Sequence, residues 1–361
     1  MGHAPNDTRD LGRREKGWTM SHVRHNMAMK RRVILVAVAA ILMGSSCTAG
    51  SDGAASEAAP NDTEITEELV DNTKIGNPNQ QIDEPPVTVG DSAVVGPGGL
   101  EDGEQAILDE LQAEGFCDPA DVEDGGVVTA MHFVVRGQLQ PPCSGELDPR
   151  LDAAWTALAD VTPVTLLSNI SLLAGFEGCD TCDTLAFVTT LDEAAEFFLM
   201  AVDVQAGVED LNELALTMLH ELTHVFTQVP ATQLDIAIPA QECTTYYNGT
   251  GCFRDGAYTW EWIQRFWDAA ALATIPADGD VNEEAGEARC VADASYAGPY
   301  GASSPEEDIA EMFAAYVFDV KVSTSLDEKL AFFDQYPEFR EVRERAEALG
   351  RHEVAYSFEN C

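Results

Sequence analysis

Lysine and arginine are scarce in this sequence. Its 361 residues include 20 of these bases against 63 aspartates and glutamates, and the formal net charge is −43. This balance argues strongly against nucleic acid as a partner, because phosphate binding needs lysine and arginine. It also argues against a basic membrane-surface helix in the folded part. The hydrophobic fraction of 45% is ordinary, so most of the chain can still bury a core.

The few bases are unevenly placed. Residues 1–46 hold eight of them with three acids, which leaves 12 bases and 60 acids over residues 47–361. The lysines of that longer part are Lys74, Lys321 and Lys329. A surface with this excess of acid suits an exterior rich in salt or cations, and it favours cationic or neutral substrates over acidic ones.

The apolar stretch near the N-terminus is too short to span a bilayer comfortably. Val33 to Met43 has 11 residues and follows a basic segment, as in the core of a signal peptide. Gly44-Ser45-Ser46-Cys47 comes next and resembles a bacterial or archaeal lipoprotein signal, in which the cysteine is lipidated. We therefore expect residues 1–46 to be a lipoprotein signal peptide and the protein to reach the cell surface. The alternative is a cleaved secretory peptide with an incidental Cys47. The true start could also be Met20, Met27 or Met29.

Nine cysteines support export. With Cys47 assigned to the lipid, eight remain, and an even number in an exported chain indicates disulfides. Nearness in sequence favours Cys117–Cys143 and Cys243–Cys252, which leaves Cys290 for Cys361. Cys179 and Cys182 form a CxxC, which is open to three interpretations: a redox pair, half of a zinc site, or a small disulfide loop at a turn. A second CxxC, which a zinc site of that kind needs, is missing.

The order of elements along the chain predicts an α+β fold. Residues 47–99 lack aromatic residues and sustained periodicity, which indicates a disordered acidic tether. Two subdomains are expected after it, over 100–230 and 231–361. Strands are expected at 127–135, 164–174 and 185–190, with 197–204 as a strand or part of a helix. Helices are expected at 148–160, 211–229, 258–272, 305–322, 326–334 and 338–349.

The expected helix 211–229 contains His220-Glu221-Leu222-Thr223-His224, an H-E-x-x-H motif. Residues four apart share a helix face, so the two imidazoles can hold one metal ion, with Glu221 beside it to accept a proton from water. Residues 47–361 contain only four histidines, and two of them stand in this motif. The pattern therefore predicts a metal site on this helix.

A third ligand is expected from the segment around residue 307. Ser304 and Glu307 form a capping box with Pro305 at the first helical position, so a helix begins here. Glu307 and Glu311 then share a face that is otherwise apolar, and an inward carboxylate needs a partner such as Zn²⁺. Glu307 is the preferred ligand and Glu311 the alternative. His132 and His352 lack supporting context.

The two segments together resemble a known group. Tyr300-Gly301, followed by a helix with the E-x-x-A-E pattern and preceded by H-E-x-x-H, is similar to the zincin metallopeptidases related to the anthrax lethal factor catalytic domain. It is also similar to bacterial zinc-binding metallopeptidases of that pattern. The sequence departs from them at Asp308-Ile309, where aromatic residues are usual, and in the long segment between His224 and Tyr300.

The resemblance implies both a fold and a set of roles. The fold is zincin-like (gluzincin-like), a small mixed sheet packed on the H-E-x-x-H helix, followed by a mainly helical C-terminal subdomain and stapled by disulfides. His220, His224 and Glu307 are then zinc ligands, Glu221 is the general base and Tyr300 polarises the substrate.

These inferences predict a zinc metallopeptidase, an endopeptidase that hydrolyses peptide bonds through a zinc-activated water. Its substrate would be a peptide or protein, its contact with a membrane would pass only through lipidated Cys47, and we expect a monomer. The apolar segment 197–204 is the candidate strand for aligning an extended peptide. Two alternatives stay open: a zincin fold that has lost catalysis and binds partners at the cell surface, and a thiol-redox lipoprotein that uses Cys179 and Cys182.

Overall fold

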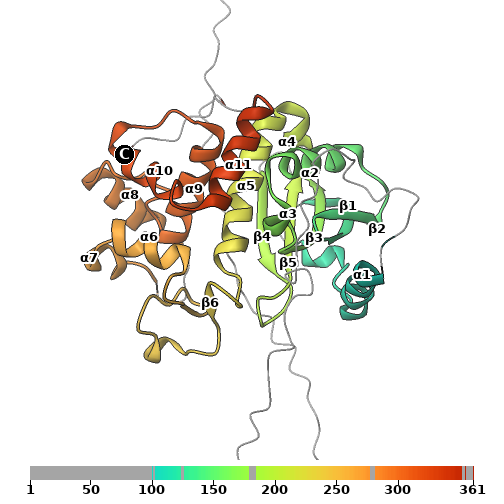
Figure 1. Ribbon diagram of the computed structural model, residues 1–361, viewed down its shortest axis with the longest axis horizontal. Helices are drawn as coiled ribbons and strands as arrows, with labels where there is room; N and C mark the ends of the chain where they lie inside the picture. Colours follow the sequence, from blue (N-terminus) through green and yellow to red (C-terminus); the bar gives the residue numbers. More distant parts are fainter. Residues whose placement is uncertain are drawn as a thin grey trace, which may run out of the picture. The chain divides into compact units, whose positions relative to one another are not determined.

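The computed structural model describes residues 100, 102–122, 126–178, 184–276, 281–351, 354 and 361. These residues belong to one compact unit and form a mixed α/β fold with a five-stranded sheet and eleven α-helices (Figure 1). The expected signal peptide and tether, the Cys179–Cys182 motif and His352 lie outside them. No helix in this described part is long and apolar enough to cross a membrane.

The five-stranded sheet has the order β2-β1-β3-β5-β4. Its strands are β1 (Val127–Val135), β2 (Gln138–Gly145), β3 (Ile170–Glu177), β4 (Ala186–Thr190) and β5 (Phe198–Asp203). β3 and β5 are parallel, and the other neighbours are antiparallel. β5 is therefore an interior strand, whereas β4 is an edge strand that runs antiparallel to its neighbour.

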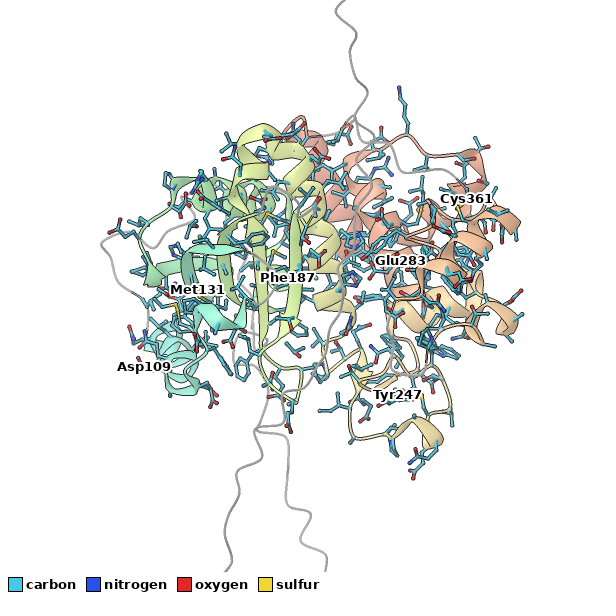
Figure 2. All side chains as sticks on the ribbon, turned by 180° about the vertical axis from the view of Figure 1, so that it is seen from behind. Asp109, Met131, Phe187, Tyr247, Glu283 and Cys361 are labelled. Carbon is cyan, nitrogen blue, oxygen red and sulfur yellow. A yellow bond between two sulfur atoms is a disulfide. The ribbon has the colours of Figure 1, made fainter. Side chains whose placement is uncertain are left out.

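Apolar side chains cover both faces of this sheet. On one face Ala130, Val134, Leu173 and Met200 belong to the larger core, with residues of α2 (Pro149–Val161) and α5 (Leu211–Thr227). On the other face Met131, Leu172 and Leu199 pack with Phe187 and with α1 (Asp102–Glu114); Figure 2 labels Met131 and Phe187 on the sheet. Successive side chains of a strand point to opposite faces, so strands buried on both sides are apolar throughout. This explains why 197–204 shows no alternation.

Helices form most of the chain after α5. They are α6 (Tyr258–Phe266), α7 (Ala269–Leu272), α8 (Glu283–Ala292), α9 (Pro305–Phe318), α10 (Asp327–Phe333) and α11 (Pro337–Ala348). α9 packs against α5 on one side and against α6, α10 and α11 elsewhere. The expected sequence of strands first and helices later is thus found, with the metal-motif helix between them. The subdomain boundary at residue 230 stays a prediction.

Three expected elements are placed differently. The strand expected from 164 starts only at Ile170, because the Pro163 carbonyl accepts bonds from the next turn and starts the short helix α3 (Val164–Leu167). The helix expected over 258–272 is two helices, because the Asp268 side chain accepts from the N–H groups of residues 270 and 271 and caps α7. The helix expected to 322 ends at Phe318, where Asp319 is left-handed with φ 49°. The sequence patterns did not indicate α1, β2, α4 (Val204–Glu209) or α8.

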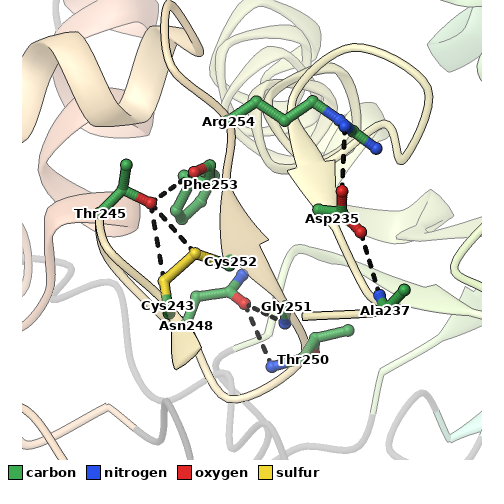
Figure 3. The surroundings of a disulfide bond; sticks show 10 residues. All are labelled: Asp235, Ala237, Cys243, Thr245, Asn248, Thr250, Gly251, Cys252, Phe253 and Arg254. Atoms are coloured by element: carbon green, nitrogen blue, oxygen red, sulfur yellow. Dashed lines mark hydrogen bonds and ion pairs between the residues drawn. A yellow bond between two sulfur atoms is a disulfide. The ribbon is translucent and has the colours of Figure 1, made fainter. Parts of the chain in front are cut away.

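Three of the expected disulfides are confirmed. They are Cys117–Cys143, Cys243–Cys252 and Cys290–Cys361. Cys243–Cys252 closes a loop that returns to a small two-stranded sheet of β6 (Leu234–Asp235) and β7 (Cys252–Phe253) (Figure 3). The Thr245 hydroxyl in this loop donates to the Phe253 carbonyl. Part of the long segment between the H-E-x-x-H motif and Tyr300 is therefore a stapled hairpin.

Candidate metal centre

The helix α5 carries the H-E-x-x-H motif into the middle of the molecule. Asp210 caps its start by accepting from the N–H groups of Asn212 and Glu213. Its apolar face packs in the larger core, as the spacing predicts. His220, Glu221 and His224 are all at least 96% buried. Three buried polar side chains on one helix need polar or metal partners, because an unpaired buried charge is costly.

The helix α9 brings the partner. Ser304 caps it, its hydroxyl accepting from the Glu307 N–H at 3.2 Å, and Pro305 occupies the first helical position, as expected. Glu307 is buried and faces α5. Its Oε2 lies 3.1 Å from Nε2 of His220 and 3.4 Å from Nε2 of His224. The two Nε2 atoms are themselves 3.1 Å apart.

These three atoms fit one face of a zinc tetrahedron. Zinc binds nitrogen and oxygen at roughly 2.0–2.2 Å, so two donors at a tetrahedral angle lie about 3.3 Å apart. The three separations of 3.1, 3.1 and 3.4 Å match that edge. A tetrahedral ion held this way keeps a fourth position for water or substrate, as catalytic sites do.

Glu311 takes a different place from Glu307. Its Oε1 lies 3.8 Å from Nδ1 of His220, the ring nitrogen on the far side from the other donors. Its Oε2 is buried and has no hydrogen-bond partner among the described residues. Burial, with the charge of Glu307 added, raises the pKa of Glu311 well above its ordinary value. Of the two expected candidates, the structure brings Glu307 to the converging donors and sets Glu311 behind one histidine.

Electrostatics at the donors favour the charged carboxylate. Burial alone would raise the pKa of Glu307, but the facing imidazoles of His224 and His220 hold it well below its ordinary value. For His224, burial opposes the charged form, but the Glu307 carboxylate outweighs burial and raises its pKa to about 9. A metal ion at these donors would therefore compete with a proton for this pair.

Glu221 lies beside the donors and against the edge of the sheet. Its carboxylate accepts a hydrogen bond from the backbone of Val188 in β4, and its Oε2 has no partner among the described residues. Burial raises the pKa of Glu221 to about 8. A carboxyl whose pKa lies near neutrality can accept and return a proton.

Tyr300 lies in the turn before α9. Its ring centroid is 6.1 Å from that of His220, and its hydroxyl is hydrogen-bonded to Glu307. Burial, together with the nearby carboxylates, raises the pKa of Tyr300 well above 10.0. The hydroxyl therefore keeps its proton and serves as a donor at the centre.

Other expected residues lie elsewhere. His132 is buried in β1, where its Nδ1 is 2.7 Å from the Gln140 carbonyl, and it does not belong to the His220–His224–Glu307 group.

The expectation that segment 197–204 aligns a substrate is wrong. Most of it forms β5, whose two sides pair with β3 and β4, so the main chain of this strand cannot pair with a peptide. The edge strand next to β5 is β4, and the order of the strands decides this.

Comparisons with known proteins add little. No family model matches the sequence, and no curated protein matches it. Among solved structures, the chain is similar to a candidate zinc-binding metallo-peptidase from Bacteroides caccae. Sequence identity is 16%, the match covers 69% of this chain and 88% of the other, and the TM-score is 0.24. At that TM-score the likeness establishes neither fold nor activity, so the geometry of the side chains has to carry the assignment.

Proposed function

We propose that the protein is a zinc metallopeptidase that cleaves peptide bonds within peptides or proteins. The observation that carries this proposal is the triangle of donors from His220, His224 and Glu307, with Glu221 held beside it. A motif on one helix and a capped carboxylate on another, 83 residues later, meet at zinc-ligand spacing. A structural cluster would need only satisfied hydrogen bonds, whereas Oε2 of Glu221 has no hydrogen-bond partner in the part of the chain that the structure describes.

The three donors would hold the metal, and the residues around it have separate tasks. When bound, zinc supplies a Lewis acid that polarises the scissile carbonyl and lowers the pKa of water. Glu221 takes the proton from the attacking water and delivers it to the leaving amine. Tyr300 donates its hydroxyl to the oxygen on which negative charge develops. Glu311 faces Nδ1 of His220 and orients that ring.

The substrate would lie along β4. This strand is the edge of the sheet next to the centre, and its Val188 backbone already contacts Glu221. An extended peptide that pairs with an edge strand is held by main-chain hydrogen bonds, which do not depend on its sequence. Such pairing would place successive peptide bonds beside Glu221.

The proposal includes the setting of the enzyme. The basic segment, the short apolar run and Cys47 support export and a lipid anchor at the outer face of the cytoplasmic membrane, with secretion as the alternative. Disulfides among the described residues support an oxidising compartment. We propose a monomer that meets the membrane only through lipidated Cys47.

Glu221→Gln tests the chemistry. The zinc-loaded full-length protein, with disulfides intact, is incubated with a broad peptide library, and zinc content is measured in parallel. The variant should keep zinc and lose hydrolysis, whereas Glu213→Gln on the same helix should behave as the wild type. If the wild type binds zinc and cleaves nothing, the peptidase assignment fails, and a non-catalytic zinc-binding surface protein takes its place.

Zinc affinity tests the third ligand. Glu307→Gln replaces a charged oxygen donor by a neutral amide, so its zinc affinity should fall by far more than that of Glu311→Gln. For Glu311→Gln about a 10- to 100-fold loss is expected. Undiminished zinc in His220→Ala would refute the site itself.

A further inference from the structure

The residue that follows Glu307 lies in a buried polar cluster of its own. Asp308 is fully buried on α9, and its carboxylate accepts four hydrogen bonds from three donor groups. Nζ of Lys329 is 2.8 Å from Oδ1 and 2.7 Å from Oδ2. The indole N–H groups of Trp262 and Trp267 reach Oδ2 at 2.8 and 2.9 Å. These four side chains, Asp308, Lys329, Trp262 and Trp267, are called the Asp308 cluster.

Burying the charges of this cluster costs desolvation free energy. Lys329 is 2% exposed, and its ammonium lies 4.2 Å from the centroid of the Tyr296 ring. A buried ion pair often stabilises a fold no better than apolar residues of the same shape, because both charges must be desolvated. In a sequence with 20 bases, one lysine is nevertheless buried against Asp308, the residue that follows the proposed metal donor Glu307. A role in geometry explains its presence better than a role in stability alone.

The cluster fixes the side of α9 that faces away from α5. Consecutive helical residues point about 100° apart, so Glu307 faces the histidines while Asp308 faces α6 and α10. Trp262 belongs to α6, Trp267 follows it directly, and Lys329 belongs to α10. Four directed bonds on one carboxylate therefore define both the rotation and the axial position of the first turn of α9.

Small rotations of this turn matter at the metal. A carboxylate about 5–6 Å from the helix axis moves by about 1 Å when the helix turns by about 10°. Metal–ligand distances tolerate only about 0.2 Å. The capping bond from Ser304 holds the end of the helix but leaves its rotation to packing, whereas the Asp308 cluster resists rotation with hydrogen bonds.

We propose that Asp308, held by Lys329, Trp262 and Trp267, is a positioning residue that sets the Glu307 carboxylate at the metal centre. The inference rests on the metal centre of the proposed function and is independent of peptide hydrolysis. Asp308 does not touch the metal, and it acts only through the placement of Glu307. Loss of any one donor to Asp308 should therefore weaken and distort metal binding without removing a ligand.

Zinc affinity and the cobalt spectrum of the full-length protein test this role. Lys329→Met removes a cation near the centre, which by charge alone would tighten Zn²⁺ binding, whereas a positioning role predicts that the Kd rises about tenfold. Trp267→Phe removes one hydrogen-bond donor to Asp308 without any change in charge, and it replaces Lys329→Met in the test if that variant does not fold. The Kd of Trp267→Phe for Zn²⁺ should rise severalfold. In both variants the visible absorption of bound Co²⁺ should change shape, since the ligand geometry changes.

Val317→Ala is the matched control. Val317 is a buried residue further along α9, so its truncation weakens the same helix without touching the Asp308 cluster. It should unfold at a lower temperature and still bind Zn²⁺ with the Kd and cobalt spectrum of the wild type. Wild-type Kd and spectrum in folded Lys329→Met and Trp267→Phe would overturn the proposal while leaving the metal centre in place. Failure of the wild type to bind zinc would instead refute the centre, and the positioning role with it.

Discussion

Gly286 supports the turn that carries Tyr300, and an alanine there should destabilise the protein. A Cβ built on Gly286 in α8 would lie 2.4 Å from the Pro299 carbonyl oxygen and 3.1 and 3.2 Å from Cα and Cβ of Ser303. Carbon–oxygen contacts are ordinarily no closer than about 3.3 Å. The helix or the turn must therefore move by about 1 Å, and this turn leads directly into the Ser304 cap of α9.

Two opposing effects set the size of the change. Alanine is a better helix former than glycine by about 0.5–1 kcal/mol. Overpacking against backbone costs about 1–3 kcal/mol. The obstructing atom is a backbone carbonyl, which cannot rotate away as a side chain could, so the upper part of that cost applies. The free energy of unfolding should fall by about 1–2 kcal/mol, and Tm by about 3–6 °C for a domain of this size.

Thermal unfolding followed by circular dichroism, with the disulfides intact, measures this change. Gly103→Ala is the control, because Gly103 lies in the helix α1 and its added Cβ meets nothing within 4 Å. That variant should unfold at the wild-type temperature or slightly above. The reasoning is refuted if Gly286→Ala is as stable as the wild type, since the close approach of α8 to the turn would then be absent.

Two further predictions concern pH and the disulfides. The Arg150 side chain is hydrogen-bonded to Asp148 at the start of α2 and lowers the pKa of Asp148. The contact therefore stabilises the fold above the unfolded-state pKa of about 3.9, and this stabilisation is lost as pH falls through the lower folded-state pKa. Asp148→Ala should cost about 1 kcal/mol in urea unfolding at pH 7 and less in acid, and a difference independent of pH would exclude the charge as its source. Cys290–Cys361 spans 71 residues and Cys243–Cys252 spans nine, so loop entropy predicts losses of about 4 and about 2.5 kcal/mol for the paired serine variants. Equal losses would contradict that model.

Local sequence patterns predicted the parts of the centre well. The apolar spacing placed a helix over the H-E-x-x-H motif, and α5 has the capped start and buried face that such spacing implies. The Ser304 capping box placed the start of α9 at Pro305. Short-range cysteine spacing gave two disulfides, and the third followed by elimination. Each of these features is decided by residues within one or two turns or by loop length.

Other features could not be read locally. The apolar composition of 197–204 does not say whether this strand lies at the edge or in the interior of the sheet. The neighbouring strands that pair with it decide this. Glu307 and Glu311 share one helix face, so the choice between them depends on how α9 crosses α5. The breaks at Asp268 and Asp319 lie within patterns that still look helical, because a single cap overrides the propensity of its neighbours.

The sequence by itself therefore determined which side chains can serve a metal and on which helices they stand, because helical spacing and capping are local properties. The tertiary structure decided which carboxylate meets both histidines, which strand lies open beside Glu221, and that Asp308 pairs with Lys329. These depend on the crossing and rotation of α9 and on strand order, which arise from contacts between residues far apart in the chain. Local sequence patterns do not specify the rotation of α9, and a rotation of about 10° is enough to carry the Glu307 carboxylate out of reach of a metal ion.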